Sequence, residues 1–323
     1  MTISKPNISL LHQRAQLLKE LRLFFDDRGF LEVQPPCLAR DCVADPYIDP
    51  LSVDGQLLAL ADPQLPEKLY LQTSPELSMK RMLAAGAPSI YAITPAFRAG
   101  ESGDMHNSEF TMLEWYEVGA DAQAGIALLG QLATGMLATD GFDVMSYRDL
   151  IEQNTGFDPI DVDLDTLQQS VATDHPQLAA TTGDDRDGLL DILISHHIQP
   201  DLGKERPIII SDYPLSQAAL AKQSANDPQC AARFELFFQG IELANGYDEL
   251  LDANELLRRT AESNRKRSTT QRQTIAPPDT LVQCMRDGLP QCAGVALGVD
   301  RLLMLRCNAN QIDQVIPFTI DRA

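Results

Sequence analysis

The sequence predicts a protein of the α+β class, and three observations lead to this prediction. Residues 109–118 alternate between two faces with the period of a strand. Gln239-Gly240 separates two strand-like runs at the spacing of a two-residue hairpin turn. Residues 9–28 repeat apolar side chains with the period of an amphipathic helix. Strands that pair in hairpins and separate helices are therefore expected together.

Composition limits the class of protein. A chain of 323 residues, 44% of them hydrophobic, can form one large domain or two small ones. The net charge is −20, which repels phosphate backbones and disfavours extended nucleic-acid binding unless a local basic patch supplies it. The six cysteines show no CxxC spacing, so we expect reduced thiols rather than zinc or disulfides. No apolar run approaches ~18 residues, and we expect a cytoplasmic protein that does not span a membrane.

The first third of the chain is predicted as helix, strand and turns. The helix at 9–28 ends at Gly29, a favourable C-terminal cap. FLEVQ, at 30–34, alternates as a strand and stops at Pro35-Pro36. Residues 40–66 are rich in turn dipeptides, and a strand near 69–72 leads into a helix that begins at Ser74-Pro75-Glu76. Residues 88–96 are predicted as a further strand.

Residues 97–107 form a predicted loop, and the strand at 109–118 carries a carboxylate on an apolar face. That face holds Phe110, Glu114 and Tyr116. Because an unpaired buried carboxylate is costly, Glu114 should have a cationic or hydrogen-bonding partner. No partner is adjacent in sequence, which suggests a ligand cation.

The middle of the chain is less informative. An apolar helix is predicted at 121–139, and DPIDVDLD at 158–165 superficially resembles a calcium loop. The glycine and glutamate that an EF-hand requires at its sixth and twelfth positions are missing, so calcium is not expected. His196-His197 lacks matched ligands nearby and is expected at the surface or in packing.

The hairpin around Gln239-Gly240 follows a predicted buried strand at 207–214. Its register pairs Phe237 with Glu242 and places Glu235 on the same face, roughly 7–8 Å away on the diagonal. Two such carboxylates suit Mg²⁺ with substrate phosphates, or they are solvated on an edge hairpin. A bulge, for which Asn245-Gly246 is suited, is needed for later residues to face the same side.

Two segments near the C-terminus complete the predicted elements. Residues 252–268 are predicted as a helix with a basic cluster, either a solvated face or an anion site. The cluster comprises Arg258, Arg259, Arg265, Lys266 and Arg267. Residues 294–306 open with glycines and continue as an apolar helix.

Three segments resemble the motifs of class II aminoacyl-tRNA synthetases, at about 13–38 (motif 1), 97–118 (motif 2) and 294–306 (motif 3). Phe97-Arg98, HNSEFTMLEWY and IELANGYDEL match the lysine-specific branch, and in particular its short paralogues. The resemblance implies an antiparallel sheet flanked by helices, a single catalytic domain over 1–323 without an anticodon-binding domain, and a homodimer through motif 1.

The resemblance also implies a function. The short paralogues are ATP-dependent ligases that activate (R)-β-lysine or lysine as an adenylate and transfer it to a lysine ε-amine on elongation factor P. They use ATP and Mg²⁺ and do not act on tRNA. Two alternatives from other classes are a tRNA-charging synthetase, which the acidic composition disfavours, and a non-catalytic regulator, which the retained ATP-site residues disfavour.

Site residues follow from the same resemblance. Arg98 would hold the α-phosphate and the substrate carboxylate, and Arg301 the γ-phosphate. The other ATP-binding positions are Glu101, His106, Asn107, Phe110 (stacked on adenine) and Glu235. The metal ligands are Glu235 and Glu242. The substrate-binding positions are Glu76, Glu114, Tyr116, Asn245, Tyr247, Glu249 and Ala296.

Three positions depart from the family pattern. FRAGE replaces the common FRNE, so the adenine-side glutamate is expected at Glu101, shifted by one residue. Asp104 stands where many short paralogues have arginine. Ala296 stands where lysyl-tRNA synthetases have glycine, and its methyl group favours β-lysine over α-lysine by ~1–3 kcal/mol.

Overall fold

The computed structural model describes residues 8–58 and 67–323. The end of the turn-rich segment predicted at 40–66 therefore lies outside the described residues. Two compact units are present: unit 1 runs up to Asp121 and resumes at Glu249, and unit 2 is Ala122–Asp248. Both mix helices with largely antiparallel strands, which confirms the predicted α+β class.

Unit 1 contains the elements that precede α3 and those that follow β10. From its first segment these are α1 (Ile8–Asp26), β1 (Leu31–Glu32), β2 (Leu38–Ala39), β3 (Ser52–Asp54), η1 (Gly55–Leu58), β4 (Lys68–Leu71), α2 (Glu76–Ala84), β5 (Ile90–Phe97) and β6 (Glu109–Val118). From its second segment they are α8 (Ala253–Thr269), α9 (Asp279–Gly288), β11 (Cys292–Gly298), α10 (Val299–Cys307) and η5 (Ile312–Gln314).

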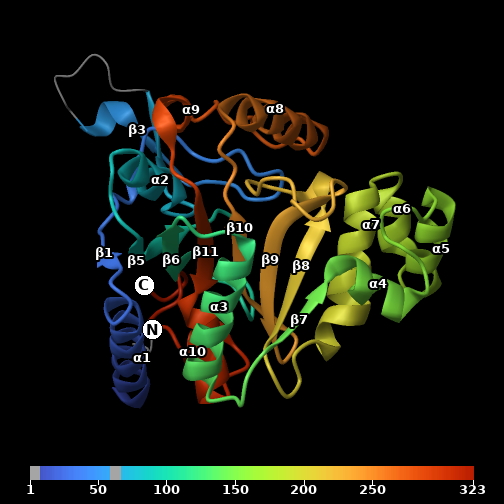
Figure 1. Ribbon diagram of the computed structural model, residues 1–323, viewed down its shortest axis with the longest axis horizontal. Helices are drawn as coiled ribbons and strands as arrows, with labels where there is room; N and C mark the ends of the chain where they lie inside the picture. Colours follow the sequence, from blue (N-terminus) through green and yellow to red (C-terminus); the bar gives the residue numbers. More distant parts are fainter. Residues whose placement is uncertain (1–7, 59–66) are drawn as a thin grey trace. The chain divides into compact units, whose positions relative to one another are not determined.

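The main sheet strands of unit 1 lie in the order β1-β5-β6-β11 (Figure 1). Strand β1 is parallel to β5, and the other pairs are antiparallel. Helix α1 packs on this sheet through Phe25, whose ring stacks on Tyr91 at 4.8 Å and lies 5.1 Å from Trp115. All three side chains are buried. The apolar face that the sequence predicted for this helix is therefore the face that packs on the sheet.

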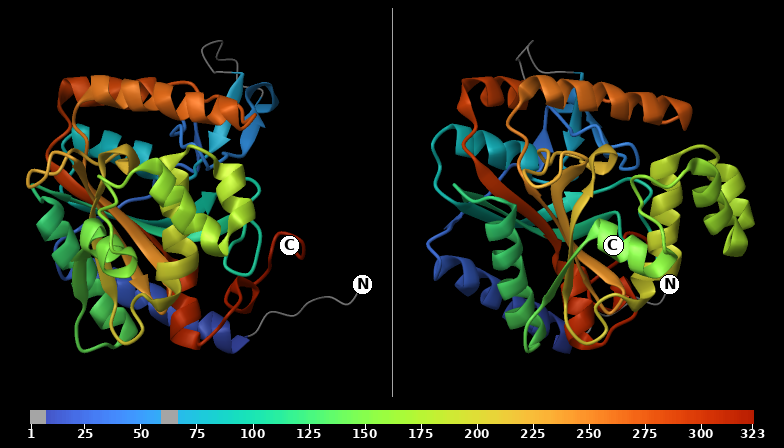
Figure 2. Two further views of the ribbon diagram at one scale, coloured as in Figure 1. Left: turned by 90° about the vertical axis from the view of Figure 1, so that its right-hand side faces the viewer. Right: turned by 45° about the vertical axis from the view of Figure 1, so that its right-hand side comes forward.

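A second layer of unit 1 is built from α8, α9, α2 and a small sheet with the order β2-β4-β3. Figure 2 shows α8 and α9 lying along one side of α2 and this sheet. Cys42, Ala44 and Ile275 form a buried cluster there, with Tyr70 against it. This layer bears on the candidate site because Asp49, between β2 and β3, accepts a hydrogen bond from Ala99 in the loop that begins at Arg98.

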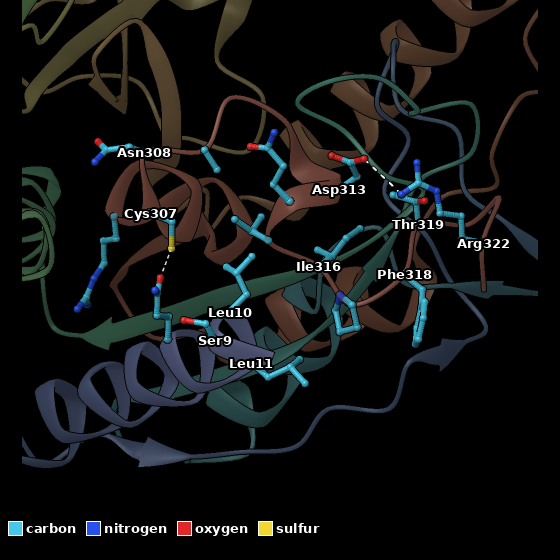
Figure 3. A pocket seen from close by; sticks show the side chains of 16 residues that line it. Ser9, Leu10, Leu11, Cys307, Asn308, Asp313, Ile316, Phe318, Thr319 and Arg322 are labelled. Atoms are coloured by element: carbon cyan, nitrogen blue, oxygen red, sulfur yellow. Dashed lines mark hydrogen bonds and ion pairs between the residues drawn. The ribbon is translucent and has the colours of Figure 1, made fainter. Parts of the chain in front are cut away.

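A hollow of about 600 Å³ lies between the start of α1 and the segment that follows α10 (Figure 3). Cys307 Sγ contacts Gln13 Oε1 at 2.6 Å on one side, and Arg322 pairs with Asp313 at 3.4 Å on the other. The described lining residues include none of the predicted site residues. The hollow is therefore separate from the candidate active site.

Unit 2 contains one strand-rich part and one helical part. Its elements are α3 (Ala122–Leu137), β7 (Asp143–Ser146), α4 (Tyr147–Thr155), α5 (Leu164–Asp174), α6 (Pro176–Thr182), α7 (Arg186–Leu193), η2 (Ile194–Ile198), η3 (Gln199–Asp201), β8 (Ile208–Pro214), η4 (Leu215–Gln217), β9 (Cys230–Phe238) and β10 (Ile241–Asp248). The strands lie in the order β10-β9-β8-β7, and only β7 and β8 are parallel. Helices α5, α6 and α7 gather around their own buried cluster (Figure 1).

The hairpin between β9 and β10 confirms the predicted register. Phe237 pairs with Glu242, and Gln239 and Gly240 both have positive φ, at 50° and 76°, as a type I′ turn requires. The predicted bulge is present, but it lies between Glu242 and Ala244 rather than at Asn245-Gly246. Because the shift occurs earlier, Asn245 lies directly opposite Glu235.

Two other predictions need correction. FLEVQ contributes only the two-residue strand β1, because the chain leaves the sheet before Pro35-Pro36. The glycines at the start of 294–306 belong to strand β11, and the helix begins only at Val299. Among the described residues, no helix is long and apolar enough to cross a membrane.

Candidate active site

The predicted site residues divide between the units. Unit 1 carries Glu76, Arg98, Glu101, His106, Asn107, Phe110, Glu114, Tyr116, Glu249, Ala296 and Arg301, whereas unit 2 carries Glu235, Glu242, Asn245 and Tyr247. In unit 1, the cross-strand register places Ala92, Glu114 and Ala296 in one row across β5, β6 and β11. Directly opposed residues share a face, so Glu114 projects between two small side chains.

Glu114 is 2% exposed and has hydrogen-bonding partners within the protein. Ser74 Oγ donates to Oε2 at 2.6 Å, and Tyr116 OH donates to Oε1 at 2.6 Å. Burial, followed by the negative charge of Glu76, raises the pKa of Glu114 from near 4.5 to about 7. The carboxylate is thus held by two hydroxyls, and it remains short of positive charge.

A buried lysine that the sequence analysis missed lies next to this carboxylate. Lys80 Nζ lies 2.5 Å from Glu76 Oε1 and 2.5 Å from Glu249 Oε2. Burial alone would lower the pKa of Lys80, but the two carboxylates outweigh burial and hold the pKa above its ordinary value. Glu76 and Lys80 are spaced i,i+4 on a predicted helix, which is the signal that could have identified the pair.

Gly294 provides the space that this cluster needs. It lies opposite Tyr116 in the register of β11 and β6. A Cβ atom at Gly294 would overlap Glu249 Oε1 and the Tyr116 ring. Only glycine therefore allows Glu249 and Tyr116 to occupy this face together.

Arg98 lies at the base of the loop that precedes β6. Its Nε donates to the Thr73 carbonyl at 3.4 Å, and its guanidinium carbon lies 5.0 Å from the centre of the Phe110 ring. Glu101 Oε1 lies 3.7 Å from Arg98 Nη1, so the glutamate predicted on the adenine side is adjacent to the arginine. Arg98, Glu101 and Phe110 are thus brought together.

His106 and Asn107 lie at the other end of the same loop, and Arg301, on α10, contacts His106. Arg301 Nη2 lies 2.6 Å from His106 Nε2. Burial and the charge of Arg301 lower the pKa of His106, which favours the neutral ring that can accept this bond. Asn107 is committed to the backbone, since its amide donates to the Glu109 carbonyl and accepts from Ile320.

Two further missed residues fix the start of α10 against β6. Asp300 accepts from the Thr111 amide at 2.6 Å and from Arg14 at 2.6 Å. Arg14 also donates to the Thr111 hydroxyl at 2.5 Å. Asp300 is 2% exposed and Arg14 is partly buried, so this ion pair ties α1, β6 and α10 together immediately before Arg301.

In unit 2, Glu235 is engaged on both oxygens. Tyr213 OH donates to Oε2 at 2.5 Å, and Arg233 Nη2 lies 2.6 Å from Oε1. Arg233 Nε also donates to Asn245 Oδ1 at 3.3 Å, and Asn245 Nδ2 donates to Tyr247 OH at 2.6 Å. Three of the hairpin residues predicted from sequence, Glu235, Asn245 and Tyr247, are therefore connected through Arg233, which the sequence analysis missed.

The donor set for a metal is small. Glu235 and Glu242 lie on one face of the hairpin, and each carboxylate oxygen can accept more than one contact. Across residues 8–58 and 67–323, no group of three or more His, Cys, Asp or Glu side chains could hold an ion. Mg²⁺ nevertheless needs only one or two protein carboxylates when substrate phosphates provide its other ligands. The number and type of these two residues therefore fit that ion.

Other polar segments have structural roles. Asp163 caps α5 by accepting from the Thr166 amide at 2.8 Å. His196 and His197 pack against His175, with ring centres 4.6 and 5.1 Å apart, and His196 is also exposed, so the prediction of a surface or packing role is confirmed. The basic cluster on α8 was predicted as a solvated face or an anion site. The solvated alternative is wrong for Arg267, which is 1% exposed.

Comparison with known proteins identifies the family. The profile of tRNA synthetases class II (D, K and N) matches residues 2–322. The chain therefore belongs to this class II synthetase family, whose members are ATP-dependent ligases, and it is an enzyme. The predicted synthetase fold and ligase class are confirmed.

Individual relatives are more specific. Proteins named elongation factor P–(R)-β-lysine ligase from Enterobacter sp. (strain 638) and Salmonella arizonae are each 39% identical to this chain, over 321 and 320 residues. These alignments cover 99% of this chain and 98% and 97% of the relatives. The protein of that name from Pectobacterium carotovorum is 38% identical over 317 residues, which cover 98% of this chain and 97% of the relative.

Proposed function

We propose that this enzyme activates (R)-β-lysine, or lysine, with ATP and transfers it to a lysine ε-amine of elongation factor P. The observation that carries the proposal is identity of 38–39% to ligases of that name over nearly their whole length. The chemistry of the unit 1 site supports the same substrate class.

The buried carboxylates suit a cationic amino acid. Lys80 already neutralises part of the charge of Glu76 and Glu249. Both side chains that donate hydrogen bonds to Glu114 are neutral hydroxyls, and the charge of Lys80 offsets its burial only in part, so the terminal ammonium of the substrate would complete its partners. Tyr116 fixes the orientation of Glu114, and half-buried Ala296 borders the same face, where its methyl group would select between lysine isomers.

The arginines suit the reaction of ATP. Attack of the substrate carboxylate on the α-phosphorus forms the adenylate and releases pyrophosphate. Arg98 would hold the α-phosphate and the carboxylate in line, and Arg301 the γ-phosphate. Phe110 would stack on adenine, with Glu101, His106 and Asn107 shaping the loop. Mg²⁺ held by Glu235 and Glu242 would offset phosphate charge. In the second step the acceptor amine attacks the acyl carbon, an amide forms and AMP leaves.

The assay for activation is ATP–pyrophosphate exchange with (R)-β-lysine, (S)-β-lysine and L-lysine. We expect exchange with lysine isomers and its loss in Arg301→Ala. Arg306→Ala is the matched control, because Arg306 lies on the same helix and pairs with Glu20 instead. Exchange that is unchanged in Arg301→Ala would overturn the assignment of the ATP site.

The homodimer remains part of the proposal. The proposal rests on the resemblance of residues 13–38 to motif 1, a segment in which Leu23 and Leu31 are 49% and 51% exposed. Sedimentation at micromolar concentration should give a dimer, and a monomer would contradict this part. Charging of tRNA is the second candidate, and the net charge of −20 disfavours it.

A further inference from the structure

Arg267, in the last turn of α8, has an environment that sequence did not predict. Its buried guanidinium donates to the carbonyls of Asp45 and Ile48 at 2.7 and 2.9 Å. It also donates to the carbonyl of Gln273 at 2.7 Å and to Asp49 Oδ1 at 2.6 Å. Four acceptors spread around one planar group match the fork of arginine, which a lysine ammonium cannot reproduce.

Asp49 connects this arginine to the loop of the candidate site. Its second carboxylate oxygen, Oδ2, accepts from Arg272 at 2.7 Å. Its backbone carbonyl accepts from the amide of Ala99 at 2.8 Å, in an isolated antiparallel bridge. Ala99 directly follows Arg98. Asp49 therefore links Arg267 of α8, through its side chain, to the backbone next to Arg98, through its carbonyl.

Three consecutive amides around Arg98 are each held by a different segment. Phe97 donates to the Gln72 carbonyl at 2.9 Å, and Arg98 donates to the Ser108 carbonyl at 2.9 Å. Ala99 donates to Asp49 as described. The Phe97 bond continues strand β5, and the Arg98 bond closes the loop between β5 and β6. The Ala99 bond can form only if the 45–49 segment is held in this position.

We propose that Arg267 is a positioning residue for adenylate formation. Together with Asp49 it forms the Arg267–Asp49 clasp, which fixes the 45–49 segment, holds the Ala99 amide and thereby sets the place of Arg98. The inference rests on the proposed role of Arg98 at the α-phosphate. The hydrogen bonding of the clasp itself does not depend on that role, and the two can be tested separately.

The test compares Arg267→Lys and Asp49→Asn with a matched control, Asn264→Ala. Asn264 lies on the same helix and bonds the backbone of Ile275 at 2.8 and 2.9 Å instead of the 45–49 segment. In both clasp variants we expect kcat for ATP–pyrophosphate exchange to fall about 10-fold or more, because small misplacements of a positioning group are costly. The KM for ATP and the KM for the lysine substrate should both rise, because Arg98 is proposed to hold the α-phosphate and the substrate carboxylate. Asn264→Ala should stay within about twofold of the parent in all three constants.

A second measurement is hydrogen exchange at the Ala99 amide, which should be faster in both clasp variants and unchanged in Asn264→Ala. Kinetics equal to the control would overturn the proposal, as would unchanged exchange at Ala99. If Arg267→Lys does not fold, Asp49→Asn decides, since its side chain is partly exposed. If the parent activates no amino acid, the proposed function fails, and exchange at Ala99 alone then decides whether the clasp exists.

Discussion

Replacing Glu114 by glutamine should stabilise the protein while impairing its activity. Glu114 is fully buried, and its pKa is raised from near 4.5 to about 7. Keeping it ionised above pH 7 therefore costs roughly 3 kcal/mol relative to its unfolded state. Glutamine fills the same volume without a charge and can still bond the hydroxyls of Ser74 and Tyr116.

The pH dependence gives the sign of the effect. Because the folded pKa of Glu114 is the higher one, the folded state binds this proton more tightly, and stability is lost as pH rises from about 4.5 to about 7. Glu114→Gln should therefore gain roughly 3 kcal/mol at pH 8.5, and most of that gain should disappear at pH 5. For a chain of 323 residues this corresponds to about 4 °C in the unfolding midpoint.

Denaturant unfolding of both proteins at the two pH values measures this difference. Glu117→Gln is the matched control, because Glu117 lies on the opposite face of the same strand and should change stability by less than about 0.5 kcal/mol. In exchange assays kcat/KM for (R)-β-lysine should fall about 10-fold or more in Glu114→Gln, because a charged hydrogen bond to the substrate is lost. A variant that is less stable than its parent at pH 8.5, with the same pH dependence, would refute the reasoning.

Three further substitutions test neighbouring positions. Lys80→Met should lower the free energy of unfolding by about 3–5 kcal/mol, because Glu76 and Glu249 lose their buried cation, and a loss below about 1 kcal/mol in denaturant unfolding would contradict this. Gly294→Ala should cost about 1–3 kcal/mol and raise the KM for lysine substrates, because the added methyl group displaces Glu249; an unchanged KM in exchange kinetics would argue against it. Ala296→Gly should shift the ratio of kcat/KM values toward L-lysine by about 5- to 150-fold, and a constant ratio would show that the methyl group does not select the isomer.

Local patterns predicted much of the fold. Strand β6 spans Glu109–Val118 as its alternation required, and the hairpin at Gln239-Gly240 has the predicted pairing. Strand β11 was not predicted, because its glycines resemble the opening before a helix and only the pairing with β6 makes them a strand. The bulge was placed late, because its position depends on how β9 and β10 pack rather than on the residues of β10 alone.

The sequence predicted which residues belong to the candidate site more readily than it predicted which residues they contact. The need of Glu114 for partners followed from its place on an apolar face, but Ser74 comes from a turn far away in the sequence. Lys80 was missed because a lysine on a helix is usually solvated, and its burial depends on Glu249, which is distant in the sequence. Arg267 was assigned to a solvated face or an anion site for the same reason, since its acceptors lie in the 45–49 segment and at Gln273.

The central claim is tested most directly by acyl transfer. The enzyme would be incubated with ATP, Mg²⁺ and labelled (R)-β-lysine, together with either purified elongation factor P or total tRNA. We predict label on elongation factor P, lost in Arg301→Ala, and none on tRNA. Label on tRNA and none on the protein would contradict the account.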